Sequence, residues 1–138
     1  MKLMTKELET AFVVQGRTSE KFEEETMVLA HYFAGSWEWW ATEYYPRDRT
    51  FFGLVRGLVV KLGYFSLSEL EKISCNVIPS GGIKRDLHWT PRSLATVRKE
   101  IADKEIIHYV LTGNQARQSA SALSAQVNDG QKDYKAGR

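Results

Sequence analysis

The apolar residues near the N-terminus follow a helical spacing. Thr5 is suited to cap a helix, an apolar stripe follows it, and Gly16 is suited to end the helix. The stripe consists of Leu8, Ala11 and Phe12. The spacing therefore predicts a helix over residues 5–15. Residues 17–26 are polar and rich in glutamate, so we expect a solvated linker there.

The pattern then changes to runs of β-branched and aromatic residues, the composition that is typical of strands. The runs cover residues 27–34, 37–45 and 51–60, and polar turn signals separate them. We interpret them as three consecutive antiparallel strands. Shorter strands are expected at residues 76–79 and 83–89.

The turn at residues 46–49 suggests a register for the second and third strands. If Tyr45 pairs with Thr50, then Trp39 and Glu43 share one face of the sheet with Phe52, because side chains alternate along a strand. On the opposite face two glycines leave a trough in which the indole of Trp40 can lie flat. These glycines are Gly53 and Gly57.

Two further helix starts are visible. Ser66 and Glu69 form a capping box, which predicts a helix over residues 66–74. Thr90 followed by Pro91 predicts a helix over residues 91–111. Its final apolar residues could instead form a last strand, but we favour the helix.

These elements predict an α+β fold. We expect a mostly antiparallel sheet of about four or five strands, covered by two or three helices, in one domain formed by residues 1–111. Residues 112–138 are polar, and we expect them to form a flexible tail. A length of 138 residues fits a single hydrophobic core.

The charge distribution weakens a first impression of nucleic-acid binding. A net charge of +2 and a pI near 8.7 favour such binding. Residues 1–43, however, carry 4 basic and 8 acidic side chains, and residues 44–111 carry 11 basic and 7 acidic ones. These two parts cancel, so the net charge of +2 lies in the tail. We therefore expect the protein to bind a partner through oppositely charged surfaces and not to bind nucleic acid through its net charge.

Cysteine content and the N-terminus indicate a compartment. The single Cys75 excludes an internal disulfide, and we expect it to be a buried apolar side chain. Charged residues occupy the N-terminal positions where a secretory signal needs its apolar stretch. We therefore expect a cytoplasmic protein without membrane contact.

Aromatic residues interleaved with basic ones suggest a binding surface. Our candidate partner-binding residues are Trp37, Trp39, Arg47, Arg49, Arg56, Lys84 and Arg85. Possible acidic contacts are Glu20, Glu23, Glu24 and Glu25. Such a surface could also stack single-stranded nucleic acid, with Lys61 adding a phosphate contact. The more economical explanation for the aromatic residues is that they form the core.

Evidence for catalysis is weaker. Asp86 and His88 are two residues apart, and Glu43 could join them in a metal site of a small hydrolase. Catalytic metal sites need three protein ligands or a carboxylate cluster, and the sequence has no such pattern. A structural ion pair between Glu43 and Arg85 is the alternative. We predict no catalytic residues, no metal and no cofactor.

Six stretches of the first 89 residues carry a family resemblance. They are KLMTKEL (2–8), WWATEY (39–44), FFGLV (51–55), GL (57–58), LGYFSLSEL (62–70) and RDLHW (85–89). In this order they resemble domain-of-unknown-function family 2958. We expect the residues after Thr90, including the long helix and the tail, to depart from the family's pattern or to extend beyond it.

The resemblance implies a small cytoplasmic protein of plasmids and integrative elements, with no established activity. Because mobile elements carry genes against host defence, our leading hypothesis is a non-enzymatic inhibitor of anti-CRISPR or anti-restriction type. Its partner would be a host defence nuclease or guide-RNA complex. The alternatives are a nucleic-acid-binding accessory protein of plasmid maintenance or transfer, and the small metal-dependent hydrolase.

Overall fold

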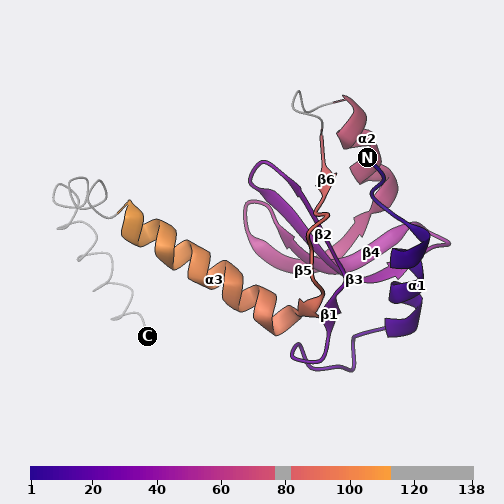
Figure 1. Cartoon of the computed structure of the whole chain (residues 1–138), viewed down its shortest axis with the longest axis horizontal. Coiled ribbons are helices and arrows are strands. Elements are labelled where there is room, and N and C mark those ends of the chain that lie inside the picture. The colour runs from indigo at the N-terminus through magenta and orange to yellow at the C-terminus, as the bar shows by residue number, and fades with distance from the viewer. Residues whose placement is uncertain (77–81, 113–138) are drawn as a thin grey trace, which may run out of the picture. The chain divides into compact units, whose positions relative to one another are not determined.

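The computed structural model describes residues 1–76 and 82–112 (Figure 1). Its contacts divide the chain into two compact units, Met1–Arg98 and Lys99–Arg138. All strands and the first two helices lie in the first unit, and the third helix crosses from the first unit into the second. The single domain over residues 1–111 stays a prediction, and the tail beyond Thr112 lies outside the described residues.

The first unit has the predicted α+β architecture. Its helices are α1 (Lys6–Gln15), α2 (Leu67–Asn76) and the start of α3 (Leu94–Leu111). Its strands are β1 (Met27–Val28), β2 (Ala30–Ala34), β3 (Trp37–Tyr45), β4 (Thr50–Arg56), β5 (Val60–Ser66), β6 (Lys84–Arg85) and β7 (Arg92–Ser93). None of the described helices is long and apolar enough to cross a lipid bilayer.

The strands form two antiparallel sheets. The larger has five strands in the order β5-β4-β3-β2-β6, and β1 and β7 make a second sheet of two strands. The predicted run 51–60 is two strands, because a hydrogen bond from the Gly57 N–H to the Val59 carbonyl closes a turn inside it. β5 was therefore missed. The strand expected at residues 76–79 falls almost entirely outside the described residues, and Asn76 is helical.

The register of β3 and β4 is correct at one end and wrong at the other. Tyr45 pairs with Thr50 as predicted, but a bulge between Ala41 and Glu43 shifts the pairing by one residue. A bulge reverses the alternation of side chains. Trp39 and Glu43 consequently lie on opposite faces of the sheet, not on one face.

One face of the sheet carries the main core. Its buried residues are Ala30, Tyr32, Trp39, Ala41, Tyr44 and Phe51, and Leu3, Phe12, Leu67, Leu70 and Ile83 cover them. Phe12 from α1 packs with its ring centre 6.0 Å from those of Tyr44 and Phe51. The Tyr32 hydroxyl donates to the Leu3 carbonyl at 2.6 Å, which fixes the N-terminal segment. We call this the core face and the opposite one the second face.

The predicted helix caps are right at two of three positions. Thr5 accepts a hydrogen bond from the Leu8 N–H at 3.2 Å, and Ser66 accepts one from the Glu69 N–H at 3.2 Å. The third helix begins at Leu94 with Ser93 as its cap, so the start predicted at Thr90 was wrong. Arg92 and Ser93 pair with β1 instead, and this pairing keeps them extended.

Candidate binding surface

Four exposed apolar side chains lie at one end of the five-stranded sheet. Trp37 begins β3 opposite Ala34, and the β4–β5 turn follows at the same end. The four are Phe33, Trp37, Leu58 and Val59, with exposed fractions of 37%, 45%, 98% and 65%. We call them the hairpin end. Phe33 lies on the face of His31 and Trp37 on the face of Trp39, so the four side chains share the end of the sheet and not one of its faces. Exposed apolar side chains that gather at one end of a sheet often mark an interaction site.

The indole of Trp37 is held flat at this end. A β-carbon built on Gly57 would lie within 2.9 Å of Trp37 Cε3, so the ring covers bare backbone there. We predicted such a trough for Trp40, and the bulge explains the difference, because it changes which residues face the glycines. Trp39 stacks on Trp37 with ring centres 6.1 Å apart but is buried in the core.

Basic side chains occupy the two rows of the sheet next to the hairpin end, one row on each face. Lys84, Phe33, Glu38, Arg56 and Val60 form one row across the sheet, and Arg85, Tyr32, Trp39, Val55 and Lys61 form the next. These rows contribute four cations and one carboxylate. The Glu38 carboxylate lies 3.6 Å from Arg56 Nη1 and 2.8 Å from His31 Nε2. This end of the sheet is therefore positively charged on balance.

The remaining predicted cations lie at the other end. Arg47 and Arg49 are exposed in the β3–β4 turn, where Arg49 has a positive φ of 51°. Arg49 forms an ion pair with Glu71 and donates to the Ser68 hydroxyl at 3.0 Å, and its carbonyl accepts from the Leu67 N–H. Arg49 therefore joins the turn to α2. The seven candidate residues do not form one surface.

The glutamate-rich segment 17–26 is more ordered than the solvated linker that we predicted. Thr18 and Thr26 are buried, and the Leu94 N–H donates to the Thr26 carbonyl at 2.8 Å. Glu23 pairs with Arg98 at 2.6 Å. The other three glutamates are exposed, namely Glu20, Glu24 and Glu25.

A histidine between two carboxylates lies on the second face. His31 Nδ1 is 3.0 Å from Asp86 Oδ2, and its Nε2 is 2.8 Å from Glu38 Oε2. The ring also stacks on Trp40, with centres 5.2 Å apart at 13°, and contacts Trp89 at 5.2 Å. Each ring nitrogen of His31 thus lies within hydrogen-bond distance of one carboxylate oxygen. The spacing of His31, Glu38 and Asp86 along the sequence does not indicate this cluster.

The cluster fixes the turn after β6. Partial burial is the largest single effect on the pKa of Asp86, and it raises that pKa. Hydrogen bonds from His31 and the His88 N–H, together with the charges of both histidines, outweigh it and lower the pKa below its ordinary value of 3.8. The Trp89 N–H returns to the Asp86 carbonyl at 3.3 Å. The strand that we predicted over residues 83–89 is therefore limited to Lys84–Arg85, and the turn after it places Trp89 on the second face against His31.

Asp86→Asn should reduce stability at neutral pH and lose its effect in acid. Because the folded pKa lies below the unfolded one, the interactions of Asp86 stabilise the fold above about pH 4 and are lost as the pH falls through the folded pKa. Urea denaturation across a pH series measures the difference between wild type and variant. Asp48→Asn, in the exposed β3–β4 turn, is the control. A difference that stays constant down to about pH 2 would contradict the assignment.

Glu43 is a buried carboxylate that binds neutral donors. With 6% exposure, it accepts hydrogen bonds from the Thr18 N–H at 3.2 Å, from the Thr18 hydroxyl at 2.6 Å and from the Tyr45 hydroxyl. The hydrogen bond to Glu43, followed by burial, raises the pKa of Tyr45 to about 12. Tyr45 is therefore a proton donor to this carboxylate throughout the neutral range.

The predicted pair between Glu43 and Arg85 does not form. Arg85 lies in a row on the core face and donates from Nε to the Lys2 carbonyl at 3.1 Å, whereas the bulge directs Glu43 to the second face. Asp86 meets His88 through a backbone hydrogen bond of 3.0 Å. Among the described residues, no group of three or more histidine, cysteine, aspartate or glutamate side chains could hold a metal ion.

Comparison with known proteins places the chain in a family. Residues 3–107 match the family described as Protein of unknown function (DUF2958). The match continues to residue 107, so our expectation was wrong for residues 91–107, whereas residues 108–138 extend beyond the match. No curated protein and no solved structure matches the chain. Because the match covers most of its residues, this chain belongs to the DUF2958 family.

Proposed function

We propose that this protein is a binding protein without catalytic activity, and that the hairpin end docks on an acidic surface of a protein partner. The observation that carries the proposal is the exposure of Leu58 at 98% and Val59 at 65%, beside Trp37 and with Arg56 and Lys61 on the two strands that flank the turn. An apolar centre with a charged rim is typical of protein interfaces. The tryptophan would supply the central anchor.

The chemistry of the hairpin end favours a protein partner over nucleic acid. Its most exposed side chains are the aliphatic Leu58 and Val59, and aliphatic side chains do not stack on bases as aromatic rings do. Trp40 and Trp39, in the middle of the sheet, are 4% and 9% exposed. They are therefore not available as an open stacking platform.

The partner that we propose is a host defence nuclease or its guide-RNA complex. The family resemblance suggests a mobile-element origin, for which a defence inhibitor is a useful product. Such an inhibitor acts by covering a surface, and an apolar end with basic neighbours suits an acidic surface of the nuclease. Contact with nucleic acid would then be weak and lost with salt.

Leu58→Ser combined with Val59→Ser should abolish partner binding and leave the fold intact. Both side chains are so exposed that their removal costs little stability, but an interface centred on them would lose at least about tenfold in affinity. The measurement compares wild type and variant in cleavage assays with purified restriction and CRISPR nucleases, and in binding to each nuclease. Val13→Ser with Val14→Ser is the matched control, since these two residues are exposed on α1 at 64% and 82%.

Three results would contradict the proposal. The first is unchanged nuclease inhibition by the hairpin-end variant, and the second is an equal loss with the α1 control. The third is tight binding to a single-stranded oligonucleotide that resists salt, which would favour the nucleic-acid alternative. Failure to inhibit any nuclease in a panel would count against the defence partner.

A further inference from the structure

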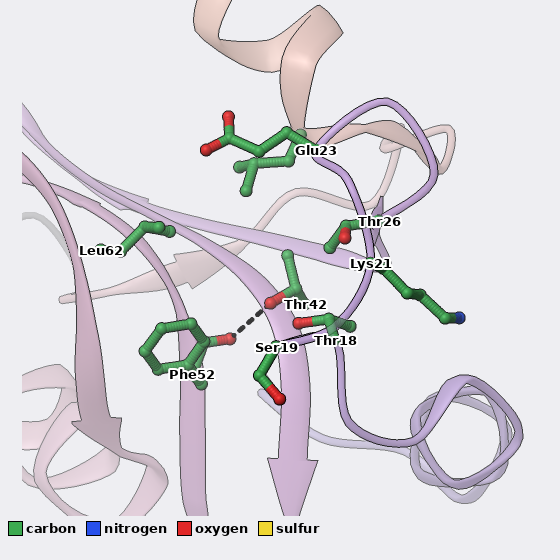
Figure 2. A pocket seen from close by; sticks show the side chains of 9 residues that line it. Thr18, Ser19, Lys21, Glu23, Thr26, Thr42, Phe52 and Leu62 are labelled. Atoms are coloured by element: carbon green, nitrogen blue, oxygen red, sulfur yellow. Dashed lines mark hydrogen bonds between the residues drawn. The ribbon is translucent and has the colours of Figure 1, made fainter.

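A pocket of about 280 Å³ opens on the second face (Figure 2). Residues of β3, β4 and β5 form one side, and the segment 17–26 with the start of α3 forms the other. The lining residues are Thr18, Ser19, Lys21, Glu23, Thr26, Thr42, Phe52, Leu62 and Leu94. The volume suits one small organic molecule.

Three buried threonines line this pocket, and the hydroxyl of each donates a hydrogen bond within the protein. Thr18 donates to the Glu43 carboxylate at 2.6 Å, Thr26 to the Phe22 carbonyl at 3.0 Å and Thr42 to the Phe52 carbonyl at 3.1 Å. Carboxylates and carbonyls can only accept, so the direction of all three bonds is fixed. The hydroxyls can therefore offer a ligand only their lone pairs.

The buried carboxylate behind Thr18 strengthens this preference. Glu43 is 6% exposed, and the donors that contact it among the described residues are neutral. Arg17 lies close enough to act electrostatically on Tyr45, but no cation among the described residues forms an ion pair or hydrogen bond with Glu43. A buried carboxylate that is held by neutral donors alone keeps a negative potential around it. Its hydrogen bond also polarises the Thr18 hydroxyl, which makes that oxygen a better acceptor. Positive charge in the pocket is thus favoured.

The charged residues at the rim leave the interior open to a cation. The Lys21 side chain extends away from Phe52 and Leu62 (Figure 2). Glu23 forms its ion pair with Arg98 at 2.6 Å. Phe52, Leu62 and Leu94 supply an apolar surface for the body of a ligand. The pocket thus combines an apolar wall with acceptor oxygens and a nearby buried negative charge.

We propose that this pocket binds a small organic cation, with a primary ammonium group on a compact apolar body. The ammonium donates to the free lone pairs of Thr18 and Thr42, and the apolar body packs against Phe52, Leu62 and Leu94. A carboxylate of the same size is rejected because the fixed hydroxyls offer it no proton. A neutral alcohol binds with an affinity between those of the ammonium and the carboxylate, since it can donate one hydrogen bond.

The test uses three probes of the same shape, namely benzylammonium, benzyl alcohol and benzoate. Two-dimensional NMR titration of the wild-type protein should show benzylammonium binding at least about fivefold more tightly than benzyl alcohol, with benzoate weaker still. The shifted amide signals should centre on Thr18, Thr42 and Phe52. This ligand comparison needs no variant and therefore does not depend on how substitutions affect folding.

Thr42→Val then tests the acceptor directly. It keeps the shape of the side chain and should weaken benzylammonium binding about fivefold, whereas Thr42→Ser should retain it. Thr10→Val is the matched control, because Thr10 on α1 also donates to a backbone carbonyl, at 2.9 Å, but lies outside the pocket. Equal binding of benzoate, shifts that centre elsewhere, or no detectable benzylammonium binding at millimolar concentration would overturn the proposal.

Discussion

Gly53→Ala is expected to lower the free energy of unfolding by about 3 kcal/mol or more, among the largest losses for a single methyl group. A β-carbon on Gly53 would clash with the Trp40 carbonyl oxygen and would lie 2.9 Å from the Ala41 Cα. Both obstacles are backbone atoms, which cannot move aside as a flexible side chain can. The bulge brings this backbone close, so the variant must distort the bulge or separate β3 from β4.

Gly63→Ala is the matched control for this prediction. Gly63 pairs with Gly53 across β4 and β5, and nothing lies within 4 Å of a β-carbon built on it. Alanine there should be close to neutral or slightly stabilising, because it reduces the freedom of the unfolded chain. Urea denaturation of the two variants gives the comparison. Equal stabilities would show that Gly53 is not constrained by the bulge.

The bulge also explains which parts of the fold the sequence could predict. Caps at Thr5 and Ser66 depend on residues three positions apart, so local chemistry is sufficient to place them. The pairing of Tyr45 with Thr50 follows from the adjacent turn. The extra residue at Thr42 leaves no signal in the composition. For the β3 residues that precede Thr42, the face that we assigned relative to β4 was consequently the wrong one.

The β4–β5 turn was missed for a different reason. Leu58 and Val59 have strand-forming side chains, so the run 51–60 resembled one long strand. Gly57 was the available signal, because glycine inside an apparent strand often marks a turn or a close approach. The turn determines the candidate site, since an uninterrupted strand would not have left Leu58 98% exposed at its tip.

Long-range contacts were beyond the reach of a single sequence. His31 and Asp86 meet at 3.0 Å although 55 residues separate them. The acidic first part of the chain also presents less negative charge outward than its sequence suggests, because Glu38 contacts His31 and Glu43 contacts Thr18. The outward acidity that remains is concentrated in the segment 17–26. Trp37 and Arg56 were candidates from the sequence and lie at this end of the sheet, whereas Leu58 and Val59, its most exposed apolar residues, were not.

Glu43→Ala should lower the free energy of unfolding by about 3 kcal/mol, and its effect should begin in the segment 17–26. Removing the carboxylate leaves the buried N–H and hydroxyl of Thr18 without their acceptor, and each such loss costs about 1–3 kcal/mol. Glu43→Gln should cost less because it keeps the volume and one acceptor oxygen. Glu24→Ala, an exposed glutamate of the same segment, is the control.

Hydrogen exchange of the Thr18 amide distinguishes a local role from a general loss of stability. If Glu43 holds the segment on the sheet, Glu43→Ala should accelerate exchange at Thr18 more than at Tyr32, whose side chain is fully buried on the core face. Equal acceleration at both would indicate global destabilisation instead. Because Thr18 also forms a wall of the pocket, a displaced segment would open that pocket and remove its acceptor oxygen. The buried carboxylate thus couples the stability of this segment to the integrity of the pocket.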